Sequence, residues 1–274
     1  MASRPRTRSS SSRRGTTLSD ARSGVAAPTG ALDALTGALG AHGLNVWLPL
    51  DGPAFDAACA PVAPSLRLES LLPRARGALV VGSAGRPFFE GFARARAAAP
   101  DDVRRDPLDR YTRAIVTRAA RQALEGLGVA HVECFPFLRE AAGGVVIPFQ
   151  RLGRAAGLAA SSPLGLQIHP VYGAWWAYRA LVVVDAELPP GVSLSDGCAG
   201  CPAPCVGACP AGAVRRAGFV VPACHAHRLA SVPCHLSCAA RLACIRAPEH
   251  RYADEQLAFH MAASMPSRAP SPTR

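Results

Sequence analysis

The chain has 274 residues, of which 49% are hydrophobic, and 30 basic residues against 19 acidic ones give it a net charge of +11. Every basic residue is an arginine, and the absence of lysine excludes a P-loop lysine and Schiff-base catalysis. No uncharged apolar run approaches the roughly 18 residues of a membrane-spanning helix. We therefore expect a globular protein that does not enter a membrane.

The positive charge favours anionic partners. Because lysine is absent, we ascribe much of the excess to a bias toward Ala, Arg, Gly and Pro. Nucleic acid is thus an alternative partner rather than the expected one.

Residues 1–30 are predicted to form a disordered basic tail. The segment is rich in Arg and Ser and has no apolar stretch typical of a secretory signal. An organellar transit peptide is the alternative interpretation, and we expect a cytoplasmic protein. Under reducing conditions ten cysteines hold metal more often than disulfides.

The middle of the chain alternates between strand and helix patterns. The apolar runs at 77–85, 129–137 and 179–188 predict strands, and the valines of the last predict a central one. Residues 106–128 predict a helix with Asp106 as N-cap, Pro107 in the first turn and Gly128 near the end. Because there is neither a strict βαβ rhythm nor a glycine-rich phosphate loop, we expect an α+β sandwich and no Rossmann fold.

A Pro-, Gly- and Ser-rich linker at 188–197 predicts a domain boundary. We expect one domain over 31–190, a cysteine module over 191–246, a helix returning to the first domain over 247–264, and a disordered tail over 265–274. The module is too small to fold on a hydrophobic core alone, so an inorganic group must hold it together.

Eight cysteines lie in the module, and the first four crowd into twelve residues that end in Cys-Pro. The spacing departs by one residue from the ferredoxin run C-x2-C-x2-C-x3-C-P, whose thiolates bind 4Fe–4S clusters. Eight thiolates are the number that two such clusters require. The predicted ligands are Cys198, Cys201, Cys205, Cys209, Cys224, Cys234, Cys238 and Cys244.

By the ferredoxin pattern, the first cluster takes three of the first four cysteines together with Cys244, and Cys209 joins the remaining three on the second. Zinc is the alternative, because His225, His227 and His235 lie among the later thiols. Disulfide bonds between these cysteines are a third interpretation. Cys59 and Cys134 stand apart and are predicted to be small buried apolar residues.

The stretch GLQIHPVYGAWWAYRALVVVDAELPPG at 165–191 resembles the pocket segment of the cblC-type cobalamin-processing proteins, which decyanate and dealkylate cobalamins. DPLDRYTRAIVTR and EHRYADEQLAFHM, at 106–118 and 249–261, are similar to two helices of that family. The resemblance implies a nitroreductase-like fold that binds cobalamin. The cysteine module departs from the pattern, because the animal proteins of this type lack iron–sulfur clusters.

Clusters joined to such a domain resemble epoxyqueuosine reductase and the reductive dehalogenases. Both families hold a base-off cobalamin in a nitroreductase-like fold beside two 4Fe–4S clusters. Epoxyqueuosine reductase has a catalytic aspartate in a V-D-S-A-P stretch, and VECFP at 132–136 loosely matches it. The resemblance therefore implies a catalytic role for Glu133.

A corrin needs a broad apolar wall and a few polar groups at its edge. The predicted cofactor-binding residues are His169, Tyr172, Trp175, Trp176 and Arg179. An ordinary aromatic core around a strand is the alternative. Because side chains alternate along a strand, we expect one tryptophan near the corrin and the other in the core.

The roles of two of these residues stay open. His169 is predicted to bind cobalt, to bond a corrin amide or to brace the turn at Pro170. For Arg179 the alternatives are an anionic co-substrate, the nucleotide-tail phosphate or a structural ion pair.

The sequence therefore predicts a cobalamin-binding iron–sulfur reductase that takes electrons from a donor such as a ferredoxin or flavodoxin. It would remove the upper ligand of a bound corrinoid or generate Co(I) or Co(II). The alternatives are an epoxyqueuosine-reductase-like enzyme of tRNA or nucleoside modification, and a non-catalytic cobalamin carrier or redox sensor.

Overall fold

A computed structural model describes residues 29–102, 104–137, 146–158, 162–191 and 197–265. The two predicted tails lie almost entirely outside these residues. Four antiparallel strands form the main sheet in the order β1-β2-β4-β3: β1 (Val46–Asp51), β2 (Gly77–Ala84), β3 (His131–Cys134) and β4 (Trp176–Val184).

The two inner strands are apolar because helices cover both faces of the sheet. All eight residues of β2 are buried, and β4 is buried from Arg179 to its end. The prediction of a central strand over 179–188 is therefore confirmed, although the strand begins earlier, at Trp176.

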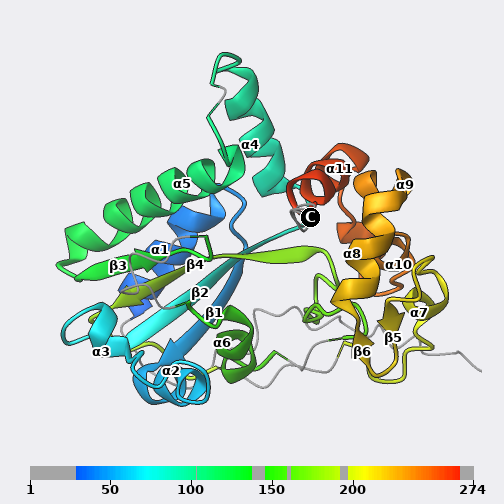
Figure 1. Ribbon diagram of the computed structural model, residues 1–274. Helices are drawn as coiled ribbons and strands as arrows, with labels where there is room; N and C mark the ends of the chain where they lie inside the picture. The colour runs from blue at the N-terminus through cyan, green and yellow to red at the C-terminus, as the bar shows by residue number, and fades with distance from the viewer. Residues whose placement is uncertain (1–28, 103, 138–145, 159–161, 192–196, 266–274) are drawn as a thin grey trace, which may run out of the picture.

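Helices lie on both sides of the sheet (Figure 1). One core packs β2 and β4 against α1 (Thr29–Gly40), α4 (Pro87–Ala97) and α5 (Pro107–Leu124). The other packs the opposite face against α2 (Gly52–Cys59), α3 (Leu68–Leu71) and α6 (Phe149–Ala155). This mixture of helices and antiparallel sheet confirms the α+β class.

Helix α5 lies where the sequence places a helix, and its buried residues Leu108, Ile115 and Ala119 form a stripe along one face. It ends in a short 3-10 turn, Glu125–Leu127, before Gly128. The N-cap prediction was wrong in its chemistry. Asp106 precedes the helix in the left-handed region, with a φ of 53°, and its side chain makes no capping hydrogen bond.

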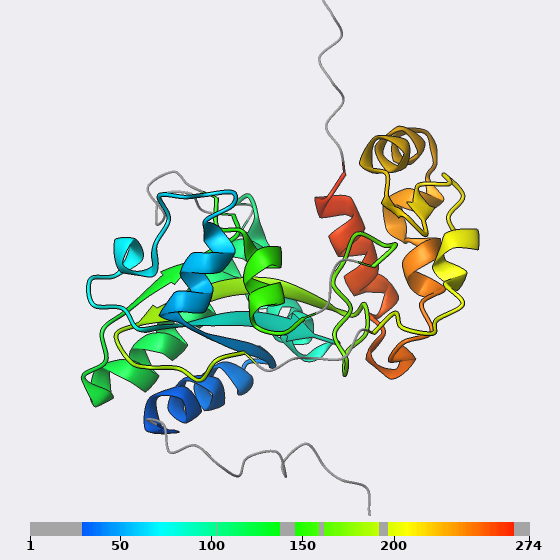
Figure 2. The same ribbon diagram turned by 90° about the horizontal axis from the view of Figure 1, so that it is seen from below.

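The cysteine module lies at one end of the sheet (Figures 1 and 2). Its elements are short: α7 (Pro204–Gly207), β5 (Val214–Arg215), β6 (Gly218–Phe219), α8 (Val221–Ala230), α9 (Pro233–Leu236), α10 (Ala239–Leu242) and a 3-10 turn, Pro248–His250. The described hydrophobic cluster at the module has six buried residues, and three of them, Leu164, Ile168 and Ala174, come from the sheet domain, which agrees with a module that needs further cross-linking.

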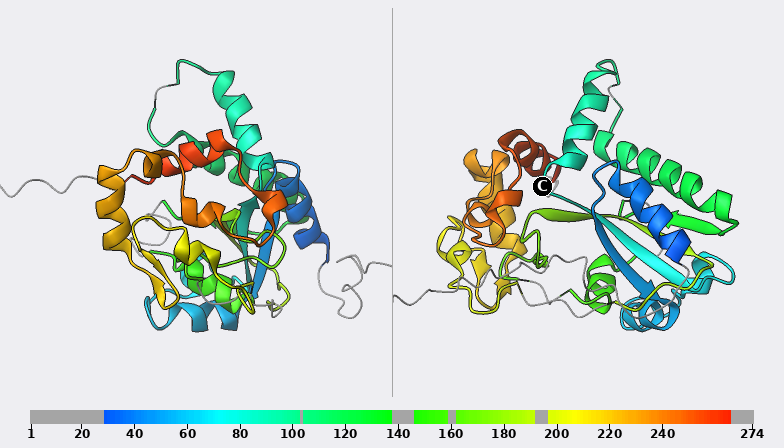
Figure 3. Two further views of the ribbon diagram at one scale, coloured as in Figure 1. Left: turned by 90° about the vertical axis from the view of Figure 1, so that its right-hand side faces the viewer. Right: turned by 180° about the vertical axis from the view of Figure 1, so that it is seen from behind.

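Helix α11 (Asp254–Ala263) joins the two parts (Figure 3). It packs against α9 of the module. On its other side, the ring of Phe259 contacts those of Phe89 and Phe92 in α4, at 5.5 and 5.3 Å between centroids. Helix α11 therefore lies between α4 of the sheet domain and α9 of the module (Figure 2).

Candidate functional site

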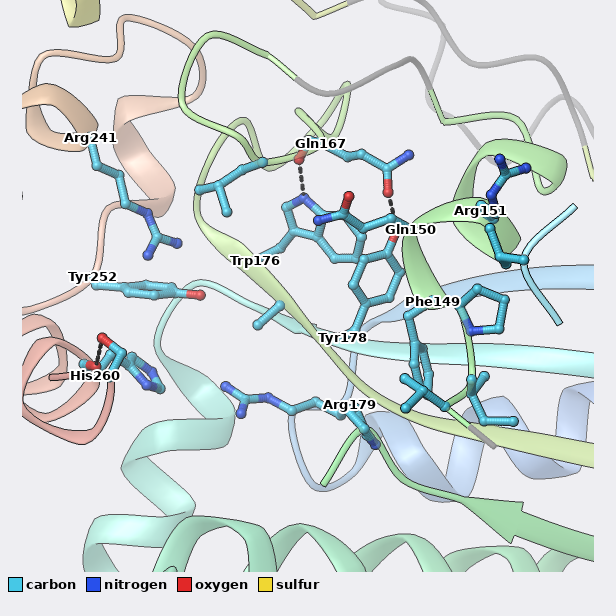
Figure 4. A pocket seen from close by; sticks show the side chains of 18 residues that line it. Phe149, Gln150, Arg151, Gln167, Trp176, Tyr178, Arg179, Arg241, Tyr252 and His260 are labelled. Carbon is cyan, nitrogen blue, oxygen red and sulfur yellow. Dashed lines mark hydrogen bonds between the residues drawn. The ribbon is translucent and has the colours of Figure 1, made fainter. Parts of the chain in front are cut away.

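A cavity of about 910 Å³ lies where the sheet meets the module (Figure 4). Strand β4 and helix α6 form one side of it with aromatic side chains. The segment from α10 to α11 forms the other side with polar side chains. The lining residues with aromatic rings or polar groups that face the cavity include Phe149, Gln150, Trp176, Tyr178, Arg179, Arg241, Tyr252 and His260.

A β-bulge in β4 places Arg179 at this cavity. Tyr178 pairs with Gly82 and Ala180 with Val81, so Arg179 is the extra residue between two paired positions. An extra residue shifts the alternation of side chains and bends the strand. As a result, Tyr178 packs on the core beside α6, whereas Arg179 lies over the ring of Phe88 in α4, 5.3 Å from its centroid.

Arg179 is a buried cation, with only 9% of its surface exposed. Its Nε donates to the Ser83 hydroxyl at 2.8 Å, and it forms no ion pair with any described residue. Burial lowers the pKa of its guanidinium. Burying a charge without a partner is costly, so this end of the cavity favours an anionic group.

Arg241 adds a second positive charge at this end of the cavity, and His260 lies there as a neutral group. Arg241 lies between Cys238 and Cys244 in the chain and reaches out of the module, where it donates through Nε and Nη2 to the Ala174 carbonyl. Burial, together with Arg179 and Arg241, lowers the pKa of His260 to about 3, so its imidazole is neutral. No aspartate or glutamate is among the described residues that line the cavity.

The apolar wall comes from β4 and α6. Trp176 lines it with its Nε1 donating to the Gln167 carbonyl at 2.8 Å, and the Tyr178 hydroxyl donates to Gln167 Oε1. The ring of Phe149 lies 5.7 Å from that of Tyr178. Hydrogen bonds and packing hold the rings in place, which gives a preformed apolar wall.

The predicted cofactor-binding residues separate into two groups. Trp176 and Arg179 line the cavity, whereas Trp175, Tyr172 and His169 do not. Trp175 is fully buried and its ring contacts that of Tyr252 at 5.5 Å. One tryptophan thus faces the cavity and the other packs in the core, as the alternation of side chains predicts.

His169 braces its own turn. Its Nδ1 accepts from the backbone N–H groups of Val171 and Tyr172, at 3.1 and 3.4 Å. Burial and the nearby His250 lower its pKa to about 4. Of the three roles predicted for His169, the geometry supports the third.

Glu133 does not line the cavity. It lies on β3, where it accepts a hydrogen bond from Thr117 of α5 at 3.1 Å and lies 3.4 Å from His131. Its contacts are therefore those of a residue that fastens a helix to the edge of the sheet. Pro136, three residues later, is the member of the VECFP stretch that reaches the cavity.

Four cavity residues, Tyr178, Arg241, Tyr252 and His260, were not predicted as site residues from the sequence. Tyr252 and His260 lie in the EHRYADEQLAFHM stretch, so a signal for them existed in the resemblance. Nothing in the sequence indicated a site role for Arg241, because it lies among the cysteines. Only the packing of the module brings it to the cavity.

The eight module thiols fall into two groups of four. A cavity of about 210 Å³ is lined by Cys198, Cys201, Cys205 and Cys244. A second, of about 30 Å³, is lined by Cys209, Cys224, Cys234 and Cys238. This grouping is the one that the ferredoxin pattern predicts.

No disulfide joins these cysteines, and no three ligand-type side chains among the described residues converge closely enough for a single metal ion. A 4Fe–4S cluster binds its thiolates at separate corners, so its ligands need not converge on one point.

Cys59 and Cys134 are buried in the sheet domain, as predicted. Burial raises the pKa of both thiols to about 11, which keeps them protonated and unreactive.

No helix in the described part of the chain is both long and apolar enough to cross a membrane.

The sequence matches no protein-family profile and no curated protein. The fold, however, is shared with a class of solved structures that includes a B12-trafficking protein and a reductase. The B12-trafficking protein CblC of C. elegans shares 13% identity with a TM-score of 0.53, over 86% of this chain and 92% of its own.

Two structures of epoxyqueuosine reductase are also similar. The enzyme from Streptococcus thermophilus has a TM-score of 0.52 at 12% identity, over 79% of this chain and 65% of its own. The enzyme with a tRNA-Tyr stem loop has a TM-score of 0.53 at 12% identity, over 81% and 67%. The chain therefore spans about two thirds of the length of these reductases, and the resemblance inferred from the sequence is confirmed for the fold.

Proposed function

We propose that the chain is a cobalamin-binding iron–sulfur oxidoreductase that reduces a bound corrinoid. The observation that carries this proposal is the position of the 910 Å³ cavity, which is walled by the sheet domain on one side and, on the other, by Arg241 of the thiol module together with Tyr252 and His260 of the segment that follows it. Arg241 links the two, because it lies between two predicted cluster ligands and contacts the cavity.

The residues present fit a corrinoid. The corrin is a wide apolar plate with amide edges, and Trp176, Tyr178 and Phe149 provide an apolar wall of matching character. Gln150 offers an amide for the edge. Arg179 and Arg241 would hold an anion, for which we propose the phosphate of the nucleotide tail, with an anionic co-substrate as the alternative.

The two four-thiol groups fit two 4Fe–4S clusters, because thiolates are the soft ligands that such clusters select. When bound, the clusters supply electrons and the cobalamin supplies the metal-centred chemistry. The chain itself excludes water from the cavity, orients the ligand and neutralises its charge. A ferredoxin or flavodoxin is the electron donor that we expect.

Anaerobic reconstitution tests the clusters. We expect about eight iron and about eight sulfide per chain. Cys244→Ser and Cys238→Ser should each leave about four iron, because each removes a ligand from a different group. Cys59→Ala is the matched control and should keep all eight. Stoichiometric zinc without labile sulfide would show that the module is a zinc site.

Addition of hydroxocobalamin to the reconstituted protein tests the reaction. With a chemical or protein electron source, the absorbance spectrum should change to that of a reduced corrinoid, and EPR should follow the clusters. If cobalamin binds but the loaded protein never reduces it, the chain is a carrier or sensor.

An epoxyqueuosine-reductase-like activity is the second candidate. The structural similarity described above favours it, as do the exposed arginines Arg113, Arg118 and Arg121 on α5. Binding of an RNA stem loop that weakens steeply with salt would support this activity. A truncated chain that begins near Gly30 should keep cobalamin binding if residues 1–30 are only a solvated tail.

A further inference from the structure

A histidine with a buried ring nitrogen faces the second thiol group. His227 lies on α8, three residues after Cys224, and lines the cavity enclosed by the four thiols of that group. Its Nε2 is buried and has no hydrogen-bond partner among the described residues. Leaving a buried polar group unpaired costs about 1–3 kcal/mol, so a partner other than the described residues is expected there.

The surroundings of His227 identify the kind of partner. The described residues that line this cavity include no carboxylate, and the Nε of Arg228 is a second buried donor there without a partner. Hydrogen-bond donors in a cavity lined by four thiols favour an acceptor that is anionic and rich in sulfur. A 4Fe–4S cluster has that character, because its sulfurs accept hydrogen bonds.

The other two histidines of the module have different environments. His235 Nε2 contacts the backbone carbonyl of Arg228 and is therefore satisfied by the protein. His225 is exposed on the same helix as His227. Among these three, His227 is the one whose ring nitrogen is buried, unpaired and at the thiol cavity.

We propose that His227, through its Nε2–H, donates a hydrogen bond to a sulfur of the second cluster and thereby raises its reduction potential. The inference rests on the proposed function, because it requires the cluster. A hydrogen bond to the sulfur stabilises the more negative, reduced state, and this is one of the means by which proteins set cluster potentials. His227 would thus favour electron storage on the second cluster.

His227→Phe tests the proposal, because it keeps a ring of similar size and removes the donor. His227→Gln replaces the donor with an amide N–H, and His225→Phe is the matched surface control. Each variant is reconstituted anaerobically, its iron and sulfide are counted, and both cluster potentials are measured by redox titration with EPR detection. The signal lost in Cys224→Ser identifies the second cluster.

We expect His227→Phe to keep about eight iron and to lower the equilibrium constant for reduction of the second cluster about tenfold, which is about 59 mV for one electron. The first cluster should be unchanged, His227→Gln should recover the potential, and His225→Phe should match the parent.

Unchanged potentials in His227→Phe would overturn the assignment, and so would a loss to about four iron, which would make the histidine a ligand or a structural residue. Failure of the parent protein to hold any cluster would instead overturn the proposed function, and this inference with it.

Discussion

Trp175 and Trp176 are neighbours in the chain with different surroundings. Trp175 is fully buried beside Tyr252, whereas Trp176 lines the cavity. We expect Trp175→Ala to lower the free energy of unfolding by about 3–5 kcal/mol. Trp176→Ala should lower it less and should weaken hydroxocobalamin binding by about 1–3 kcal/mol. Denaturant unfolding and titration measure the two effects.

The more exposed Trp47 is the control, and its replacement should leave binding unchanged. If both cavity-region variants bind hydroxocobalamin like the parent, the aromatic cluster is only core and the corrinoid assignment fails.

Arg179 combines burial with the absence of an ion pair among the described residues. Burying a charge without an ion-pair partner is costly, and an apolar residue of similar length avoids that cost. We expect Arg179→Met to be at least as stable as the parent. It should bind hydroxocobalamin about 10- to 150-fold more weakly, because a hydrogen bond to a charged group contributes about 1.5–3 kcal/mol.

Cobinamide, a corrinoid that lacks the nucleotide tail, separates the two roles of Arg179. If the guanidinium binds the tail phosphate, Arg179→Met should bind cobinamide as tightly as the parent does. The exposed control Arg113→Met should bind both hydroxocobalamin and cobinamide as tightly as the parent does. An equal loss for both corrinoids contradicts the phosphate assignment.

The lowered pKa of His169 predicts that the folded protein loses stability in mild acid. Its pKa is about 4 in the folded protein against an ordinary 6.5, so between these values the unfolded chain binds more protons. Stability should therefore fall as the pH decreases from 6.5 toward 4, with about 1–3 kcal/mol from this residue. His260 is shifted in the same direction and adds to the slope.

Urea unfolding at several pH values measures this dependence. His169→Gln should flatten it by removing the titrating group, and the exposed His225→Gln should not. A parent protein equally stable at pH 7 and pH 4.5 would contradict the burial of both imidazoles.

At the scale of elements, helix α6 depends on a glycine at its contact with β4. A Cβ at Gly153 would collide with the Tyr178 hydroxyl, the group that donates to Gln167. Gly153→Ala should therefore destabilise the protein by about 1–3 kcal/mol, although alanine favours helix. It should also weaken ligand binding by moving the cavity wall.

Gly37 of α1 is the matched helical glycine, because a Cβ there meets no atom within 4 Å. Gly37→Ala should stabilise by about 0.5–1 kcal/mol. Thermal unfolding compares the two variants, and a stabilising Gly153→Ala would show that Tyr178 is free to move.

At the scale of the whole molecule, the turn before β4 contacts the module backbone. Gly173 has a φ of 57°, and a Cβ there would collide with the carbonyl of Arg246. Gly173→Ala should loosen the module from the sheet domain, because backbone cannot move aside as a side chain can. We expect weaker corrinoid binding and faster proteolysis of the module.

Gly128 is the control, because alanine at this position would strain the backbone without a collision with another part of the chain. Its φ is 68°, but no atom lies within 4 Å of an added Cβ. Gly128→Ala should cost about 1–2 kcal/mol and leave corrinoid binding unchanged. Equal effects of the two variants on binding would show that contact between the domains does not shape the cavity.

The sequence by itself predicted strand β4, helix α5 and the closeness of the first thiols. Unbroken valines in β4 mark a strand buried on both faces, and the stripe on α5 marks a helix with one buried face, because these periods follow from local geometry. The close spacing of Cys198, Cys201 and Cys205 likewise limits them to one cavity, because a short loop cannot carry them far apart.

Only the tertiary structure decided which side chains meet at the cavity. The bulge that places Arg179 at the cavity depends on the pairing between β2 and β4. No local sequence pattern predicts the extra residue in β4. Arg241 and His260 reach the same cavity from elements far along the chain. The sequence left three roles open for His169, and its contacts in the folded chain support the one in which it braces its own turn. Long-range packing sets such contacts, and local sequence does not encode it.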